Sequence, residues 1–152
     1  MVFMAINKQR LIYLISSAIA LSAGVFCYYI FRDFNMIFFQ ILKIKVPYAN
    51  IHPLSDNFFT IFIKYNLCDG LWLLSGILFL RFIWFDNPVI CGYYIKFFIG
   101  LALLLEFLQL TKYIPGTFDI FDIFTMAFFA LLEHFINYYF TITRRKKWEK
   151  IV

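Results

Sequence analysis

Long apolar stretches, separated by polar or turn-forming residues, divide this chain into four segments of similar length. These stretches lie at about 11–31, 67–85, 89–110 and 118–142. A helix needs about 20 mainly apolar residues to cross the hydrocarbon layer of a bilayer, and each stretch meets that length. Asn87-Pro88 precedes the third stretch and Pro115-Gly116 precedes the fourth, and both pairs are typical of turns. The pattern predicts an all-α bundle of four transmembrane helices.

The connection between the first two stretches, Arg32 to Asn66, is the longest one. It contains two amphiphilic pieces, Phe34–Val46 and Asn57–Tyr65, neither of which is long and apolar enough to cross a membrane. We expect both pieces to lie in the interfacial region of the bilayer, with their lysines reaching water. An alternative is that this connection forms a lid over the polar end of the bundle.

The composition agrees with a membrane protein that forms a single domain. Of its 152 residues, 63% are hydrophobic, 23% aromatic and 15% charged, whereas a typical soluble domain is about 45–50% apolar. A chain of this length with four spans has no room for a soluble catalytic domain. Cys27, Cys68 and Cys91 are scattered and odd in number, so they indicate neither a disulfide framework nor a metal site.

The distribution of positive charge predicts the orientation in the membrane. The formal net charge is +5, and five of the 14 basic residues stand together in the C-terminal tail at 144–150. Such a cluster is typical of a cytoplasmic anchor on anionic lipid, and it does not indicate nucleic acid binding. Lys8 and Arg10 precede the first span, which is too long for a cleaved signal peptide. We therefore expect both termini in the cytoplasm.

Polar residues interrupt the last three stretches where they approach the outer face. If the third and fourth helices form an antiparallel pair, Glu106 lies level with Asp122, and Gln109 lies level with Asp119. Asp69 opens the second stretch on the same side. Ionisable groups in membrane spans are costly and usually face a bundle interior or a water-filled cavity. The sequence therefore predicts an acidic pocket at the outer rim, formed by Asp69, Glu106, Gln109, Asp119 and Asp122.

Three interpretations of this pocket stay open. It can be a hydrogen-bonded knot that locks the helix ends, with Asp119 and Asp122 capping the fourth helix. It can bind a headgroup, with or without a divalent cation, because oxygen ligands suit Mg²⁺ or Ca²⁺. It can also be catalytic, with Glu106 and Asp122 as acid and base. In each case so many carboxylates need shared protons, a cation, or a basic neighbour such as Lys112 or Arg32.

A second polar pair is expected deeper in the membrane. The same register places Lys96 level with Glu133, so the two are candidates for a buried ion pair. Lys96 lies off the face of Glu106 and Gln109, and its stem would have to bend toward Glu133. Ser75 and His134 lie at different depths, which excludes a nucleophile and base within hydrogen-bond reach.

Three short motifs follow one another between 66 and 132. Asp69-Gly70-Leu71-Trp72 opens one helix, Glu106-x-x-Gln109 closes the next, and Gly116-Thr117-Phe118-Asp119-x-x-Asp122 opens the last. In this order they resemble the VanZ-like family of small bacterial integral membrane proteins. Met126 and Phe129 stand where that family usually has Asn and Gly. The family is associated with teicoplanin resistance through its namesake, and most members have no established activity. The resemblance implies a protein of the bacterial cell envelope rather than a particular reaction.

These observations together favour a non-enzymatic envelope protein with membrane lipid as its surroundings. We expect its acidic pocket to recognise the headgroup of a lipid or a cell-wall precursor. One alternative is a membrane-embedded enzyme that acts on an envelope lipid or glycan. Another is a small subunit of a larger membrane complex, against which the scarcity of small residues on the helices counts.

Overall fold

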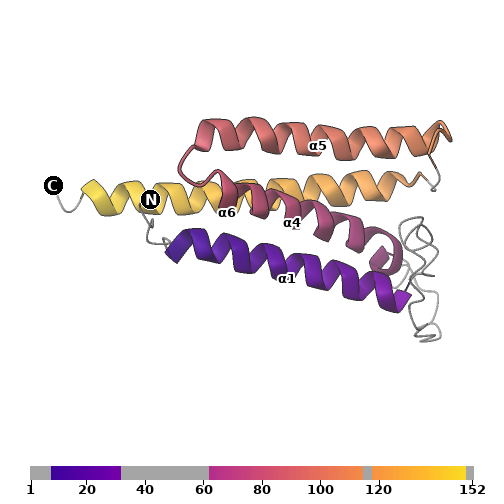
Figure 1. Cartoon of the computed structure of the whole chain (residues 1–152), viewed down its shortest axis with the longest axis horizontal. Coiled ribbons are helices and arrows are strands. Elements are labelled where there is room, and N and C mark those ends of the chain that lie inside the picture. The colour runs from indigo at the N-terminus through magenta and orange to yellow at the C-terminus, as the bar shows by residue number, and fades with distance from the viewer. Residues whose placement is uncertain (1–7, 32–61, 115–117, 150–152) are drawn as a thin grey trace, which may run out of the picture.

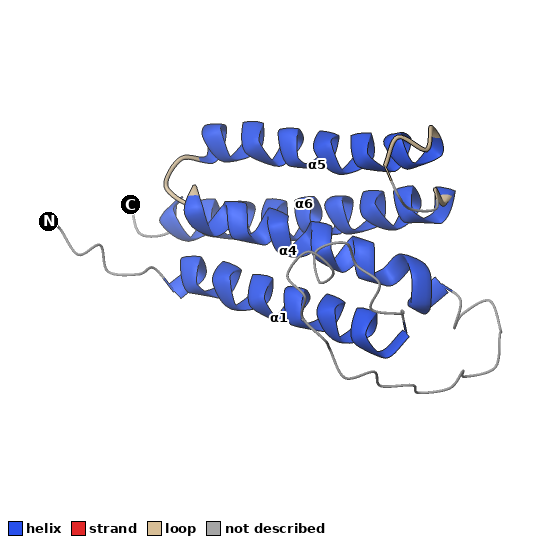
Figure 2. Ribbon diagram, turned by 45° about the vertical axis from the view of Figure 1, so that its right-hand side comes forward, coloured by secondary structure: helices blue, strands red, loops and turns tan. Residues whose placement is uncertain are grey.

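Four long helices make up the molecule in the computed structural model, which describes residues 8–31, 62–114 and 118–149 (Figure 1). They are α1 (Lys8–Phe31), α4 (Cys68–Ile83), α5 (Pro88–Leu110) and α6 (Ile120–Glu149), and a π-helical turn, η1 (Ile63–Leu67), leads directly into α4. The described residues contain no strand, as Figure 2 shows. The prediction of an all-α fold with four long helices is confirmed.

Each helix contains a segment that is long and apolar enough to cross a bilayer. The four segments are Lys8–Ile30, Tyr65–Ile83, Pro88–Leu110 and Ile120–Tyr139. Their outward faces are apolar, and Ile19, Phe97 and Phe124 are 64%, 69% and 66% exposed. A soluble protein rarely leaves such continuous apolar surface open, whereas lipid covers it at no cost. The chain is therefore a multi-pass membrane protein.

The helices alternate in direction, which gives the bundle two distinct ends (Figure 1). We call the end that holds Lys8, Ile83 and Pro88 the termini end, because α6 also leaves the bundle there toward the C-terminus. The opposite end holds Leu110 and Ile120, and we call it the carboxylate end.

Some of the sequence-based expectations fall outside the described residues. The first amphiphilic piece, Phe34–Val46, the proposed lid and the Pro115-Gly116 turn all lie there. The second piece, Asn57–Tyr65, lies there up to residue 61, and its last residues from Phe62 are helical and continue into α4.

Helix α4 is the centre of the bundle. It packs against α1, α6 and α5, most extensively against α1, whereas α5 and α6 contact each other little. The core between α4, α5 and α6 contains the buried side chains of Leu73, Ile77, Cys91, Ile95 and Met126. Helices α5 and α6 are antiparallel, as the sequence-based register assumed, but each makes most of its contacts with α4.

Three glycines allow the other helices to approach α4 closely. A Cβ atom at Gly70 would lie 2.6 Å from Cγ2 of Thr125 on α6, and one at Gly24 would lie 2.7 Å from Cδ1 of Trp72. A Cβ atom at Gly76 would overlap the ring of Phe98 on α5. Close approach at small residues is how helices pack in membranes, where no hydrophobic effect drives them together. Three of the five described glycines therefore lie where α4 receives its neighbours.

Local sequence explains where α5 begins and ends. Asn87 accepts a hydrogen bond from the Ile90 amide at 3.1 Å, and Pro88 follows it at the first helical position, as N-termini favour. At the other end the Tyr113 amide donates to the Leu108 carbonyl and the Lys112 amide donates to the Gln109 carbonyl. These two hydrogen bonds form a Schellman motif, in which Lys112 takes the left-handed position with φ 59°.

Candidate functional site

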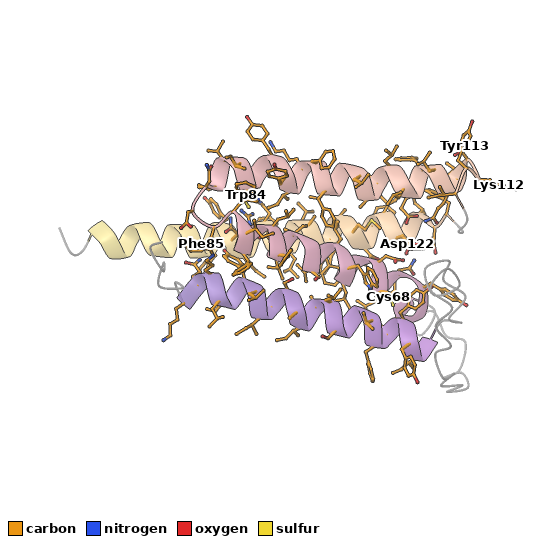
Figure 3. The ribbon with its side chains drawn as sticks, in the orientation of Figure 1. Cys68, Trp84, Phe85, Lys112, Tyr113 and Asp122 are labelled. Carbon is orange, nitrogen blue, oxygen red and sulfur yellow. The ribbon has the colours of Figure 1, made fainter. Side chains whose placement is uncertain are left out.

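Asn66 joins two carboxylates at the carboxylate end of the bundle. Its side-chain Nδ2 donates hydrogen bonds to Oδ2 of Asp119 at 3.2 Å and to Oδ1 of Asp122 at 2.8 Å. Asn66 and Asp122 are buried, with 3% and 5% of their surfaces exposed. The two hydrogens of one amide thus hold the start of α6 against the start of α4, as the position of Asp122 in Figure 3 illustrates.

Asp119 also begins α6. Its Oδ1 accepts a hydrogen bond from the Phe121 amide at 2.9 Å, so Asp119 is the N-cap of the helix. Asp122 lies in the first turn, where a negative charge interacts favourably with the helix dipole. The predicted capping role of Asp119 is therefore present, and both of its carboxylate oxygens already accept hydrogen bonds.

Glu106 brings a third carboxylate to the same end from α5. It is only 6% exposed, and its Oε2 atom is enclosed by protein. Gln109 lies one turn further along α5 and is half-buried, and Asp69 is half-buried in the first turn of α4, three residues after Asn66. All five predicted pocket residues thus lie at the carboxylate end. Of these five residues, Asp119 and Asp122 are joined to each other through Asn66.

Asn66 was not among the predicted pocket residues, because residue 66 was expected to lie at the end of a loop. In the structure the helix already includes this residue, within the π-helical turn η1. Short π-helical turns often occur at functional sites, since the wider turn redirects side chains. The spacing of Asn66, Asp69 and Gly70 on one helical face was the signal that could have identified it.

The arrangement does not favour a divalent cation at this site. Among the described residues, no group of three or more His, Cys, Asp or Glu side chains is placed so that it could hold a metal ion. An amide nitrogen, which cannot ligate a cation, lies between Asp119 and Asp122. Lys112 is exposed at the end of α5 and makes no ion pair with a described residue, and Arg32 lies outside the described residues.

A second polar layer lies toward the termini end. Arg81 on α4 forms a two-pronged ion pair with Glu133 on α6, with Nε at 2.7 Å from Oε1 and Nη2 at 3.1 Å from Oε2. Lys96 was the predicted partner of Glu133, and the structure corrects this: Lys96 is exposed and makes no ion pair with the described residues. The physical reason is that α4, not α5, packs on the face of α6 that carries Glu133.

Further hydrogen bonds tie α1 to its neighbours. The Tyr13 hydroxyl donates to Oδ1 of Asn137 at 2.9 Å. Ser17 and Ser75 each donate a hydroxyl hydrogen bond to the other's backbone carbonyl, at 2.9 Å and 3.0 Å. Ser75 is thus part of a helix contact, and His134 is exposed on α6. These positions agree with the exclusion of a Ser–His hydrolase site.

Comparison of the chain with protein-family models, curated proteins and solved structures finds no match in any of the three. The candidate site therefore rests on its own geometry, and the VanZ-like resemblance of the three motifs remains a prediction.

Proposed function

We propose that this chain is a non-enzymatic membrane protein of the bacterial envelope whose carboxylate end binds the headgroup of a lipid or a cell-wall precursor. One observation carries the proposal: Glu106 and Asp122, from two different helices, are both buried at the same end of a membrane-spanning bundle. Carboxylates in such positions are costly, and they usually mark a binding or transport pathway.

The chemistry of the site defines what it can bind. Ionised carboxylates only accept hydrogen bonds, so the ligand must donate them. Ammonium groups and sugar or glycerol hydroxyls are the donors that envelope headgroups present. A phosphodiester or a quaternary ammonium has no N–H or O–H donor to offer at neutral pH, and we expect weaker binding of either.

The proposal includes an orientation. The termini end carries Lys8 and Arg10, and the tail helix with its cluster of basic residues leaves the bundle on that side. Since cytoplasmic segments are enriched in Lys and Arg, this end faces the cytoplasm and the carboxylate end faces outward. The VanZ-like motifs support the bacterial cell membrane as the location.

A lipid-retention experiment tests the proposal. The protein is reconstituted in nanodiscs that contain equal amounts of phosphatidylethanolamine and phosphatidylcholine, and bound lipid is measured by native mass spectrometry. These two headgroups have the same charge, but only the first has N–H donors. We expect selective retention of phosphatidylethanolamine, or of an amino-sugar precursor lipid offered in its place.

The double variant Glu106→Gln and Asp122→Asn should lose at least about tenfold of this preference, which corresponds to about 1.4 kcal/mol. Asp86→Asn is the matched control, because Asp86 is an exposed carboxylate at the termini end. A wild-type protein without preference would refute the proposal. A double variant that changes only the melting temperature would assign the cluster to a structural knot. If the wild-type protein converted the offered lipid and the double variant did not, the result would instead favour a membrane-embedded enzyme.

A further inference from the structure

Lys96 places a positive charge on the lipid-facing side of α5, about a third of the way along a spanning segment. The segment Pro88–Leu110 crosses the membrane, and Lys96 is the eighth residue after Pro88, about 12 Å along the helix axis. Its side chain is exposed and makes no hydrogen bond or ion pair with the described residues. By contrast, Arg81 and Glu133 are paired with each other.

Two glycines flank Lys96 on the same face of α5. Gly92, Lys96 and Gly100 are spaced by four residues, so they follow one another along the helix surface. A Cβ atom added at either glycine would meet nothing within 4 Å among the described residues. The other described glycines, Gly24, Gly70 and Gly76, each receive a side chain of a neighbouring helix. We call the surface of Gly92, Lys96 and Gly100 the Lys96 face.

This face is unfavourable in contact with lipid unless something covers it. A glycine is a weaker helix former than alanine, and a lysine inside a span is unfavourable on scales of membrane insertion. Snorkelling relieves part of the second cost, since the side chain leans toward the start of the helix. An extended lysine stem reaches about 6 Å, which leaves the ammonium short of the surface about 12 Å away.

We propose that the Lys96 face docks a transmembrane helix of another protein that carries a buried Asp or Glu at the depth of Lys96. The glycines let the two backbones approach, and the carboxylate completes the ion pair that Lys96 lacks among the described residues. Charge complementarity decides against a second copy of this chain. Glu133, which the helix register places near the depth of Lys96, is already held by Arg81 and is only 3% exposed.

Fluorescence energy transfer in phosphatidylcholine vesicles tests this docking. The probe is a designed transmembrane peptide of Leu and Ala with two glycines, one four residues before and one four residues after a central position. That position holds Asp in one peptide, Leu in the second and Lys in the third. The labelled full-length protein should bind the Asp peptide about three- to thirtyfold more tightly than the Leu peptide, the range expected for interhelical hydrogen bonds, and the Lys peptide most weakly.

The matched control moves the charge without removing it. Exchanging residues 96 and 97, as Lys96→Phe with Phe97→Lys, keeps composition, charge and depth, but it turns the ammonium by about 100° around α5. Phe97 is 69% exposed, so the bundle tolerates the exchange. The exchange and Lys96→Met should both abolish the preference for Asp, whereas Lys96→Arg should keep it. Circular dichroism and gel filtration report whether each variant folds.

Three results would overturn the proposal. Equal binding of the Asp and Leu peptides would show that the face does not select a carboxylate. If the variant with residues 96 and 97 exchanged still preferred the Asp peptide, the preference would not depend on the face of α5 from which the lysine projects. Energy transfer between two labelled copies of the protein, lost in Lys96→Met, would identify a second copy as the occupant. None of these results bears on the carboxylate end, which lies at the other end of the bundle.

Discussion

Replacing Arg81 alone should destabilise the protein, whereas replacing it together with Glu133 should leave the stability close to that of wild type. The two side chains form hydrogen bonds of 2.7 Å and 3.1 Å, and they are only 15% and 4% exposed. Arg81→Met leaves the Glu133 carboxylate buried without its partner. Breaking a buried ion pair in this way typically costs about 3–5 kcal/mol, whereas replacing both partners by apolar residues is often neutral or stabilising.

The expected magnitude follows from the two contacts. Hydrogen bonds to charged groups contribute about 1.5–3 kcal/mol each, which gives about 3–6 kcal/mol for the pair. A chain unfolded within a micelle or membrane finds other polar partners, and this lowers the measured value. We therefore expect Arg81→Met to reduce the free energy of unfolding by about 3 kcal/mol. The double variant Arg81→Met with Glu133→Leu should return to within about 1 kcal/mol of wild type.

Titration of the purified protein from mild detergent into SDS, followed by far-ultraviolet circular dichroism, measures these free energies. Lys96→Met is the matched control, since it removes an exposed charge from a neighbouring helix, and this charge forms no ion pair with a described residue. It should leave the free energy of unfolding within about 0.5 kcal/mol of wild type. If the double variant were as unstable as the sum of the two single variants, the two side chains would not be coupled and the reasoning would be refuted.

Two further substitutions test how the helices end and pack. Lys112→Gly should stabilise the protein by up to about 1 kcal/mol, because only glycine takes the left-handed position without strain. Lys112→Ala is the control, because it removes the same charge and keeps the strain. Equal stability of the two variants would contradict this explanation. Gly70→Ala should destabilise the protein by about 1–3 kcal/mol, since the new methyl group meets Thr125 and Phe129 on α6. Gly92→Ala, which meets nothing, should be neutral or stabilising in the same SDS titration, and a loss as large as that of Gly70→Ala would argue against the packing described for α4.

The number, length and approximate bounds of the helices were predictable from the sequence. In a bilayer every backbone hydrogen bond must be satisfied within the segment, so an apolar stretch of sufficient length has to be helical. That requirement is local, and it can be judged from the chain alone. The bounds differ mainly where polar residues extend a helix, as at Asn66 before α4 and in the tail of α6.

The end of the bundle where the carboxylates gather was predictable for the same reason. Alternating spans bring the start of one helix and the end of the previous one to the same face of the membrane. Glu106 and Asp122 therefore had to lie at one end, and both are buried there. The contacts between individual side chains at this end were not predictable from the sequence. Asn66, the donor that joins Asp119 to Asp122, was therefore not predicted.

What the sequence by itself determined is that this chain crosses the membrane four times with its acidic helix ends together. Only the tertiary structure decided that α4 lies at the centre and that Glu133 pairs with Arg81 instead of Lys96. The physical reason is that lipid and protein interior are equally apolar, so the pattern of apolar residues does not reveal which face of a helix is buried. The glycine contacts and ion pairs between specific helices make that choice, and they become visible only when the helices are placed in space.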